Sequence, residues 1–252
     1  MSSQTSIEWT EQTWNPTVGC SKASPGCAHC YAEVMARRLQ AMGVKGYENG
    51  FVPTLLPNRL EEPLKRSKPT IYFVNSMSDL FHEEIPDCFI RQVFDVIQRA
   101  PQHTFQVLTK RAERMAEFFR DHEPPRNAWL GVTVEDRKFG IPRLDWLRQV
   151  PAYIRFVSVE PLLEDLGAVD LNGIHWVIVG GESGPKARPM QQEWVLNVKQ
   201  QCEEQRAAFF FKQWGVWGVD GKKRAKKQNG RLLQGKTWDA RPTVHGQGRL
   251  GG

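Results

Sequence analysis

Six short runs of β-branched and aromatic residues recur along the chain, and a polar cluster follows each of them. The runs begin at residues 70, 104, 128, 153, 175 and 208, so that consecutive starts lie 22 to 34 residues apart. A strand, a helix and two loops need about that much chain, which indicates a repeated strand–helix unit. The runs are apolar almost throughout, as expected for parallel strands that are covered on both faces.

The segments between these runs show apolar residues at helical spacing, most clearly over 90–100 and 193–205. A further helix is predicted over 31–42, after a first strand over 13–20. We expect the apolar residues of this helix to share one face, which would comprise Ala32, Met35, Ala36, Leu39 and Met42. The chain is thus predicted to hold six to seven strand–helix units.

Repeated units of this kind place the chain in the α/β class. We predict a (β/α) barrel, complete or one unit short, in preference to a doubly wound open sheet, although the alternation fits both. With 252 residues, of which 40% are hydrophobic, the chain can bury one large core. We expect a partial barrel with an N-terminal cysteine loop over residues 1–217, and a basic, Gly-rich extension over residues 218–252.

The net charge of +6 permits contact with nucleic acid. Five positive charges lie in the run GKKRAKK, which starts at Gly221 and reads either as a solvated loop or as a phosphate-binding patch. No apolar run approaches the ~18 residues of a membrane-spanning helix, and the polar first residues lack the features of a signal peptide. We therefore expect a cytoplasmic protein that does not bind membranes.

Polar residues stand at the carboxyl end of every predicted strand, which is the edge where barrel enzymes build their active sites. Any one of them could instead cap a helix or brace a loop. As a set they predict a pocket, whose candidate residues are Asn75, Ser76, Asp79, Lys110, Thr133, Glu135, Gly180, Gly181 and Lys212.

Three cysteines, Cys20, Cys27 and Cys30, follow the first predicted strand, with six and then two residues between them. Three thiolates do not complete a tetrahedral zinc site, and the neighbours of His29 leave it little freedom to supply the fourth ligand. A 4Fe-4S cluster held by three cysteines would keep one iron open for a small molecule. This interpretation is favoured, while zinc and structural or redox thiols stay as alternatives.

A cysteine triad after the first strand of a partial barrel resembles the radical S-adenosylmethionine (radical SAM) superfamily, and CAHCYAE is similar to its spore photoproduct lyase-like members. The motifs WNPTVGC, VNSMSDLF, LTKR, GVTVE, SVEPLL, VGGESG and FFKQWG, in that order, resemble the phage Gp37/Gp68 family, also known as DUF5131. Two features depart from the superfamily pattern. Its usual cysteine spacing is three and two residues, and its GGE-type motif follows the second strand, whereas GGES here follows the sixth.

The resemblance implies a radical SAM-like enzyme with a 4Fe-4S cluster on Cys20, Cys27 and Cys30, and with S-adenosylmethionine on its open iron. Reductive cleavage of that cofactor would give a 5′-deoxyadenosyl radical, with electrons from a donor such as flavodoxin or ferredoxin. The candidates for cofactor binding are then Asn75, Ser76, Asp79, Thr133, Glu135, Gly180 and Gly181. The candidate catalytic residues are Lys110 and Lys212, whose positive charge would suit a carboxylate or phosphate.

Three classes of function remain open. The leading one is a radical SAM-type enzyme acting on a nucleic acid or nucleotide-like substrate. The second is a non-catalytic iron–sulfur or zinc protein that binds nucleic acid. The third is a cluster-containing accessory protein for a phage-encoded partner. The identity of the metal and the cleavage of S-adenosylmethionine would distinguish them.

Overall fold

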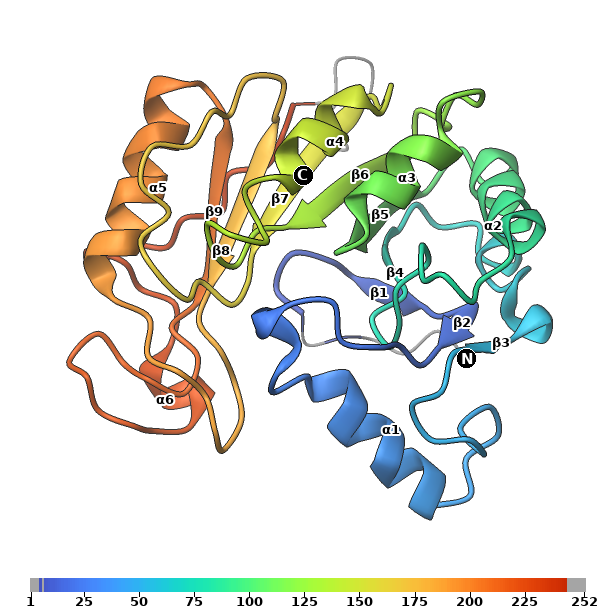
Figure 1. Ribbon diagram of the computed structural model, residues 1–252, viewed down its shortest axis with the longest axis horizontal. Helices are drawn as coiled ribbons and strands as arrows, with labels where there is room; N and C mark the ends of the chain where they lie inside the picture. Colours follow the sequence, from blue (N-terminus) through green and yellow to red (C-terminus); the bar gives the residue numbers. More distant parts are fainter. Residues whose placement is uncertain (1–4, 6, 244–252) are drawn as a thin grey trace.

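Seven parallel strands form the main sheet of the computed structural model, which describes residue 5 and residues 7–243. Each strand pairs with the next in the order β1, β4, β5, β6, β7, β8, β9. Their bounds are Gln12–Trp14, Ile71–Val74, Thr104–Thr109, Ala128–Thr133, Ile154–Val159, Trp176–Gly180 and Ala208–Gln213. The sheet curls into a half-barrel, so the predicted α/β partial barrel is confirmed (Figure 1).

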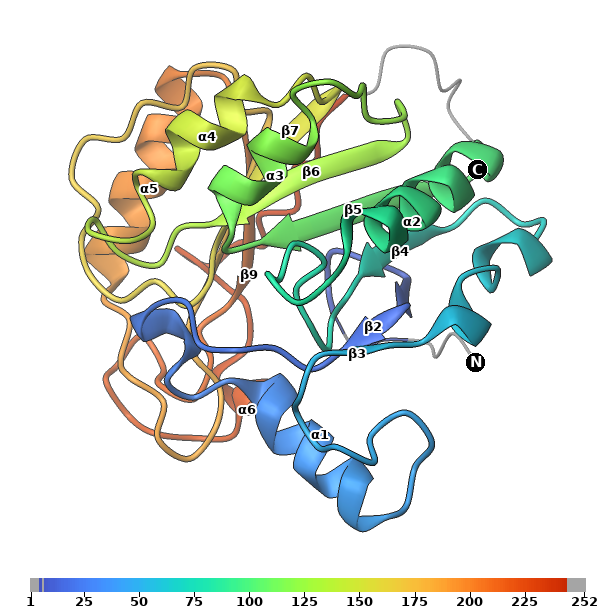
Figure 2. The ribbon, with the colours of Figure 1, turned by 45° about the vertical axis from the view of Figure 1, so that its right-hand side comes forward.

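Helices follow the strands and cover the convex outer face of the sheet (Figure 2). The covering helices are α2 (Asp87–Arg99), α3 (Ala112–Phe118), α4 (Arg143–Gln149) and α5 (Gln192–Glu204). Short 3-10 turns, η1 to η3, span Pro25–Cys27, Pro57–Arg59 and Pro63–Lys65. Among the described residues, no helix combines the length and the hydrophobicity that a membrane crossing requires.

The first strand is shorter than predicted, because the chain leaves the sheet at Pro16. Strand β1 ends at Trp14, and β2 (Thr17–Val18) pairs instead with β3 (Thr54–Leu55) in a separate antiparallel sheet. Proline has no N–H to continue the ladder. The side chain of Asn15, the residue before Pro16, accepts a hydrogen bond from the Met77 N–H at 3.1 Å. The cysteine segment therefore begins outside the main sheet.

Helix α1 (Tyr31–Ala41) forms where the sequence predicted it, but the predicted buried face is partly wrong. Ala32 and Ala36 are buried, whereas Met35 and Met42 are exposed. The helix lies apart from the layers that cover the sheet (Figures 1 and 2). Leu39 is partly buried and packs, with Ala32 and Ala36, in a cluster that includes Val18 and Leu56.

Large aromatic side chains line the concave inner face of the half-barrel. Trp129, Phe156, Trp176 and Phe210 point inward from successive strands and form one buried cluster with Trp9. The ring centroids of Trp176 and Trp9 lie 6.2 Å apart, with the rings nearly perpendicular. The inside of the half-barrel is thus packed below the strand ends.

The C-terminal segment packs along the last strand of the sheet. The N–H of Phe211 donates to the carbonyl of Trp238 at 2.8 Å, and the indole of Trp176 donates to the carbonyl of Ala240 at 2.8 Å. Leu233 is fully buried, and the short helix α6 (Lys226–Asn229) lies in the preceding loop. Residues 218–243 therefore fold as part of the barrel's edge.

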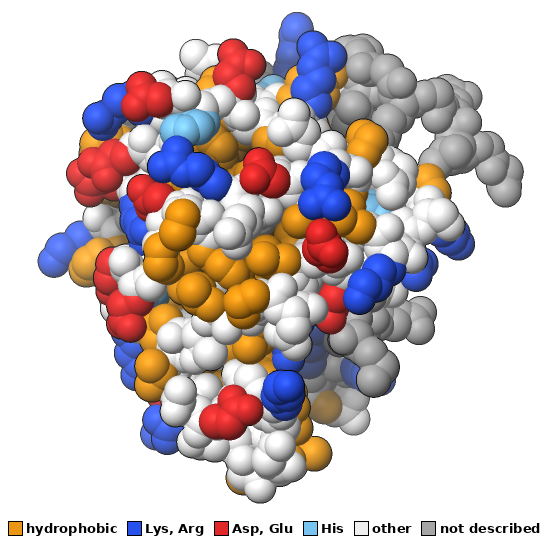
Figure 3. Space-filling view, turned by 90° about the vertical axis from the view of Figure 1, so that its right-hand side faces the viewer, with side chains coloured by type: hydrophobic (Ala, Val, Ile, Leu, Met, Phe, Trp, Pro, Cys, Tyr) orange, Lys and Arg blue, Asp and Glu red, His pale blue; other side chains and the backbone are white. Residues whose placement is uncertain are grey.

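The protein surface on the α2 side mixes charges of both signs around exposed hydrophobic side chains (Figure 3).

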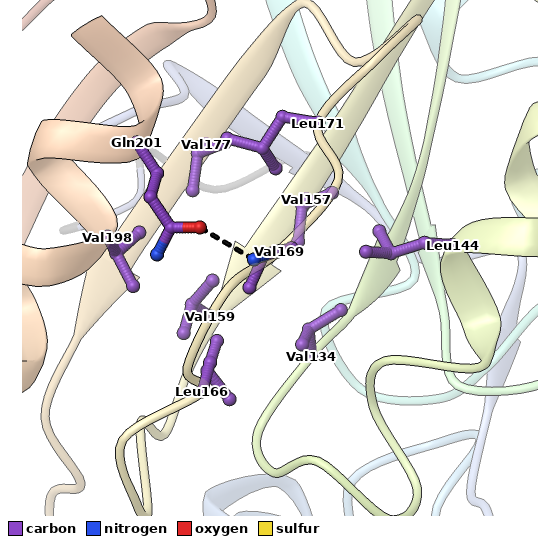
Figure 4. Close-up of a pocket in the computed structure, with 10 residues that line it drawn as sticks. All are labelled: Val134, Leu144, Val157, Val159, Leu166, Val169, Leu171, Val177, Val198 and Gln201. Atoms are coloured by element: carbon purple, nitrogen blue, oxygen red, sulfur yellow. Dashed lines mark hydrogen bonds between the residues drawn. The ribbon is translucent and has the colours of Figure 1, made fainter. Parts of the chain in front are cut away.

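A small cavity on the outer side of the sheet has no charged or metal-binding side chain in its lining (Figure 4). Its walls are aliphatic, with Val157 and Val198 facing each other, and its amide, Gln201, is used in a hydrogen bond from the Val169 N–H at 2.6 Å. It is a packing gap between the sheet and α4 and α5.

Replacing Trp9 by alanine would remove the side chain that fills the lower part of the half-barrel. We expect Trp9→Ala to lower the free energy of unfolding by about 3–5 kcal/mol, as for other buried aromatic truncations. Urea denaturation followed by circular dichroism measures this change. Val219→Ala, at an exposed side chain, should change it by less than about 0.5 kcal/mol. Equal effects of the two substitutions would contradict this packing role.

Candidate active site at the strand ends

Three free thiols lie on the loop that leads from β2 into α1. Cys20, Cys27 and Cys30 are each half-buried, and Cys30 immediately precedes the helix. Burial, and then the charge of Asp79, raise the pKa of Cys20 to about 12. Burial also raises the pKa of Cys30. The charge of Cys27 adds a smaller increase to the pKa of each.

Three cysteine thiols are a donor set that can hold a 4Fe-4S cluster. Among residues 5 and 7–243, however, no three His, Cys, Asp or Glu side chains are spaced as they stand to hold a metal ion. A second observation points to a ligand at this edge. Asn75, at the end of β4, is 3% exposed, and its side-chain nitrogen and oxygen both lack a hydrogen-bond partner.

Arg111, which follows β5, holds the first part of the cysteine loop. Its guanidinium donates to the sulfur of Cys20 at 3.5 Å and to the hydroxyl of Ser21 at 2.8 Å. Asp79 fixes this arginine at 3.2 Å and also accepts hydrogen bonds from Thr109 at 2.7 Å and from the backbone of Lys110 at 3.0 Å. Asp79, predicted to bind a cofactor, is thus used within the chain to join the ends of β4 and β5.

Glu135, which follows β6, holds the middle of the loop. Its carboxylate is fully buried, accepts a hydrogen bond from the Ser24 hydroxyl and pairs with Arg143 at 2.6 Å and with Lys110 at 3.4 Å. Burial alone would raise the pKa of Glu135, but the two cations outweigh it and lower the pKa. A side chain at Gly26 would meet the Glu135 oxygen at 2.7 Å, so the loop lies directly on this carboxylate.

Arg188 and Glu182, after β8, hold the same middle part of the loop, at Pro25. The guanidinium forms a two-pronged pair with Glu182 at 2.7 and 2.9 Å and donates to the carbonyl of Pro25 at 3.1 Å. Burial opposes ionisation of Glu182, but hydrogen bonds from Arg188 outweigh it and lower the pKa of the carboxyl group. The cysteine loop is thus tied to β5, β6 and β8 by three charged anchors.

The other predicted residues lie at the same edge with varied surroundings. Ser76 donates to Asn15 at 3.2 Å and is partly exposed, and Thr133 is buried, with its carbonyl accepting from Arg143 at 2.6 Å. Lys212 pairs with Glu160 at 2.9 Å. The structure therefore brings the polar candidates together at the mouth of the half-barrel.

Gly180 and Gly181 have a local explanation in the packing of the chain on itself. A side chain at Gly180 would meet the Glu160 carboxylate at 2.6 Å, and one at Gly181 would overlap the carbonyl of Trp214 at 1.9 Å. Both glycines let neighbouring strand ends approach, which accounts for them without a ligand.

Several residues of the site have no signal in the sequence. Arg143 lies at the start of α4 and pairs with Glu135, and His82 is a buried histidine whose ring contacts the Ser21 hydroxyl at 2.8 Å. Ser24 sits among ordinary loop residues. Ser24 and Glu135 are 111 residues apart, and Ser21 and His82 are 61 apart, so these two contacts depend on the folded arrangement.

The fold and the site define a partial α/β barrel with a three-cysteine loop at its strand ends. The chain belongs to the family described as "Protein of unknown function (DUF5131)", whose model matches residues 4–242. No curated protein matches the chain by sequence.

The fold is shared with solved structures of spore photoproduct lyase. A variant with a cysteine replaced by alanine aligns with a TM-score of 0.54 and 12% identity, over 84% of this chain and 78% of the other. A tyrosine-to-phenylalanine variant aligns with a TM-score of 0.53 and 11% identity, over 85% of this chain and 79% of the other. A structure described as a complex with dinucleoside spore photoproduct gives 0.50 and 14%, and there the alignment covers 82% of this chain but 64% of the lyase. In the first of the matched lyase structures this chain likewise spans 64% of the lyase's length.

His82 should make the stability of the loop depend on pH. Burial, and then the charge of Arg111, lower its pKa below the ordinary 6.5, so the unfolded chain takes up a proton more readily than the folded one. The free energy of unfolding of the metal-free protein is expected to fall as the pH drops below about 6.5. Urea titrations at about pH 7.5 and pH 5.5 measure this loss.

His82→Gln retains a hydrogen-bonding side chain without this titration, and its loss of stability between the two pH values should be smaller. The same loss in both proteins would show that His82 does not cause it.

Proposed function

We propose that this protein is a radical SAM-type iron–sulfur enzyme that acts on a nucleic-acid or nucleotide-like substrate. The proposal depends on the cysteine loop and its charged anchors. This loop carries three free thiols at the strand ends of a half-barrel that is similar to that of spore photoproduct lyase. Three cysteine ligands are the donor set that leaves one iron of a 4Fe-4S cluster open.

Cys20, Cys27 and Cys30 would hold the cluster. When bound and reduced, the cluster with S-adenosylmethionine supplies a 5′-deoxyadenosyl radical. The buried amide of Asn75 would offer a donor and an acceptor to the cofactor, and Ser76 lies beside it. Asp79 and Glu135 would act indirectly, by fixing Arg111 and the loop.

Lys110 and Lys212 are proposed to face the substrate. Each is paired with a glutamate, at 3.4 Å to Glu135 and at 2.9 Å to Glu160, and each is partly exposed. A substrate phosphate or carboxylate would compete for their ammonium groups. The choice of a nucleotide-like substrate is supported by the fold neighbour whose structure is described with dinucleoside spore photoproduct. A flavodoxin or ferredoxin as electron donor, a phage-encoded partner and a cytoplasmic location belong to the same proposal.

A non-catalytic role is the second candidate, and the spacing of the thiols favours it. Six residues separate Cys20 from Cys27, and the described side chains are not spaced to hold a metal as they stand. A structural iron–sulfur or zinc site that supports nucleic-acid binding, or an accessory role for a phage-encoded partner, would need no reactive cofactor.

Anaerobic reconstitution with iron and sulfide tests the proposal. We expect about four irons per chain, and formation of 5′-deoxyadenosine from S-adenosylmethionine once dithionite is added. The triple substitution of Cys20, Cys27 and Cys30 by alanine should abolish iron binding. Cys202→Ala, at a buried thiol on α5, is the matched control and should leave the iron content unchanged.

Three outcomes would contradict the proposal. Zinc in place of iron in the wild-type protein would exclude the radical mechanism. Iron with no cleavage of S-adenosylmethionine would support the non-catalytic role, and metal retention by the triple variant would refute the assignment of the ligands.

Arg111→Gln should weaken cluster binding, because it removes the guanidinium that donates hydrogen bonds to the sulfur of Cys20 and to the hydroxyl of Ser21. Hydrogen bonds to cysteine sulfur also raise the reduction potential of a cluster, so we expect a more negative potential in whatever cluster remains. Iron analysis and a redox titration followed by electron paramagnetic resonance measure both effects.

Arg148→Gln is the control for this variant, since that arginine also forms ion pairs, with Asp145 and Asp170, but lies away from the loop. An unchanged potential and iron content in Arg111→Gln would show that the Cys20 contact has no role in cluster binding.

A further inference from the structure

The lysine-rich run of the C-terminal segment is built into an ordered hairpin over residues 216–230. The N–H of Arg224 donates to the carbonyl of Val216 at 2.9 Å, and the N–H of Gly218 donates to the carbonyl of Lys222 at 3.0 Å. The side-chain amide of Asn229 closes the base by donating to the carbonyls of Gly215 and Val216. The backbone that carries the basic residues of this hairpin is therefore held in a defined conformation.

This hairpin is joined to the loop after β8, which in turn touches the cysteine loop. The indole of Trp217 donates to the carbonyl of Ala187 at 2.6 Å, and the ammonium of Lys223 donates to the carbonyl of Pro185 at 2.7 Å. The same loop contains Arg188, which holds Pro25. Figures 1 and 2 show α6, the β8 loop and the cysteine loop at one end of the molecule.

The hairpin has more positive charge than its own carboxylates can neutralise. Arg224 pairs with Asp220 at 2.6 Å, and Lys226 pairs with Glu8 at 3.3 Å. Three exposed lysines, Lys222, Lys223 and Lys227, have no carboxylate of the described residues at ion-pair distance. Lys186, exposed on the adjoining β8 loop, adds a fourth cation to the same surface.

The make-up of this surface distinguishes between two kinds of partner. A stable protein–protein interface has an apolar centre, but the hairpin presents Val219 as its one exposed large hydrophobic residue over 218–230. Interfaces with nucleic acid are polar and strongly positive, and unpaired lysines that release counterions supply their affinity. The rigid, polar hairpin fits the second kind.

We propose that Lys186, Lys222, Lys223 and Lys227 form a docking surface for the sugar–phosphate backbone of a nucleic acid, beside the mouth of the half-barrel. This inference rests on the proposed function, because it identifies the substrate as part of a polynucleotide chain rather than as a free nucleotide. The hairpin would position the strand without reading its sequence, since contacts to phosphates are independent of the bases.

Fluorescence anisotropy with fluorescein-labelled 20-mer DNA, single-stranded and duplex, tests the docking surface. The full-length protein is measured as purified and after iron reconstitution, at several salt concentrations between about 50 and 200 mM. We expect affinity that falls with salt. The triple variant Lys222→Ala, Lys223→Ala, Lys227→Ala should bind at least tenfold more weakly, with the salt slope reduced by about two on the single strand and by about three on the duplex.

A matched triple variant, Lys45→Ala, Lys65→Ala, Lys68→Ala, removes the same number of exposed lysines outside the hairpin. It should retain wild-type affinity to within about threefold, and thermal unfolding confirms that both variants fold. Equal loss in the two variants would mean that net charge alone attracts DNA, and unchanged binding in the hairpin variant would equally overturn the inference. Equal lysine-dependent binding of labelled poly-glutamate would point to an acidic protein instead.

Failure of this inference can be told apart from failure of the proposed function. A protein that cleaves S-adenosylmethionine but binds DNA independently of the hairpin refutes the docking surface alone. A protein that binds DNA through the hairpin but holds no iron refutes the radical mechanism alone.

Discussion

The buried carboxylate of Glu135 needs cationic partners, and this requirement determines how the residues at the mouth of the half-barrel are arranged. Glu135 has no exposure to solvent, so leaving it unpaired would cost several kcal/mol. Its partners come from three places, with Lys110 after β5, Arg143 on α4 and Ser24 on the cysteine loop. Satisfying one charge thus fixes a strand end, a helix and the loop together. Pairs of the same kind, Asp79 with Arg111 and Glu182 with Arg188, repeat the arrangement on either side.

Much of the fold follows from the hydrophobic pattern, because buried parallel strands leave apolar runs that no helix period explains. The hydrophobic pattern did not predict the break in the first strand at Asn15 and Pro16. The run from Thr13 to Cys20 is apolar enough for one strand, but a missing N–H turns its second half into another sheet. The exposed face of α1 is a second case. Its spacing is that of a buried helix, but Met35 and Met42 are exposed because the helix lies apart from the layers that cover the main sheet.

The sequence predicted where the candidate residues would lie, but not which groups each of them would contact. Strand ends in a barrel meet at one edge, so polar residues after each run had to gather there. Which of them face a ligand depends on partners that are distant in sequence. Asp79 and Glu135 form internal pairs, Gly180 and Gly181 lie against neighbouring chain, and the side-chain amide of Asn75 has no hydrogen-bond partner. Sequence spacing cannot distinguish these cases, because it does not show which groups are already satisfied.

The C-terminal segment crosses the exposed edge of β9, the last strand of the sheet, through the hydrogen bond from Phe211 to Trp238. An open sheet has two edges, and an uncovered edge invites pairing with another chain. One continuous segment thus forms the lysine hairpin and then shields this edge. Because the hairpin and the residues that cover β9 belong to one continuous segment, displacing the hairpin would also disturb the cover over this edge and leave β9 open to pairing with another chain.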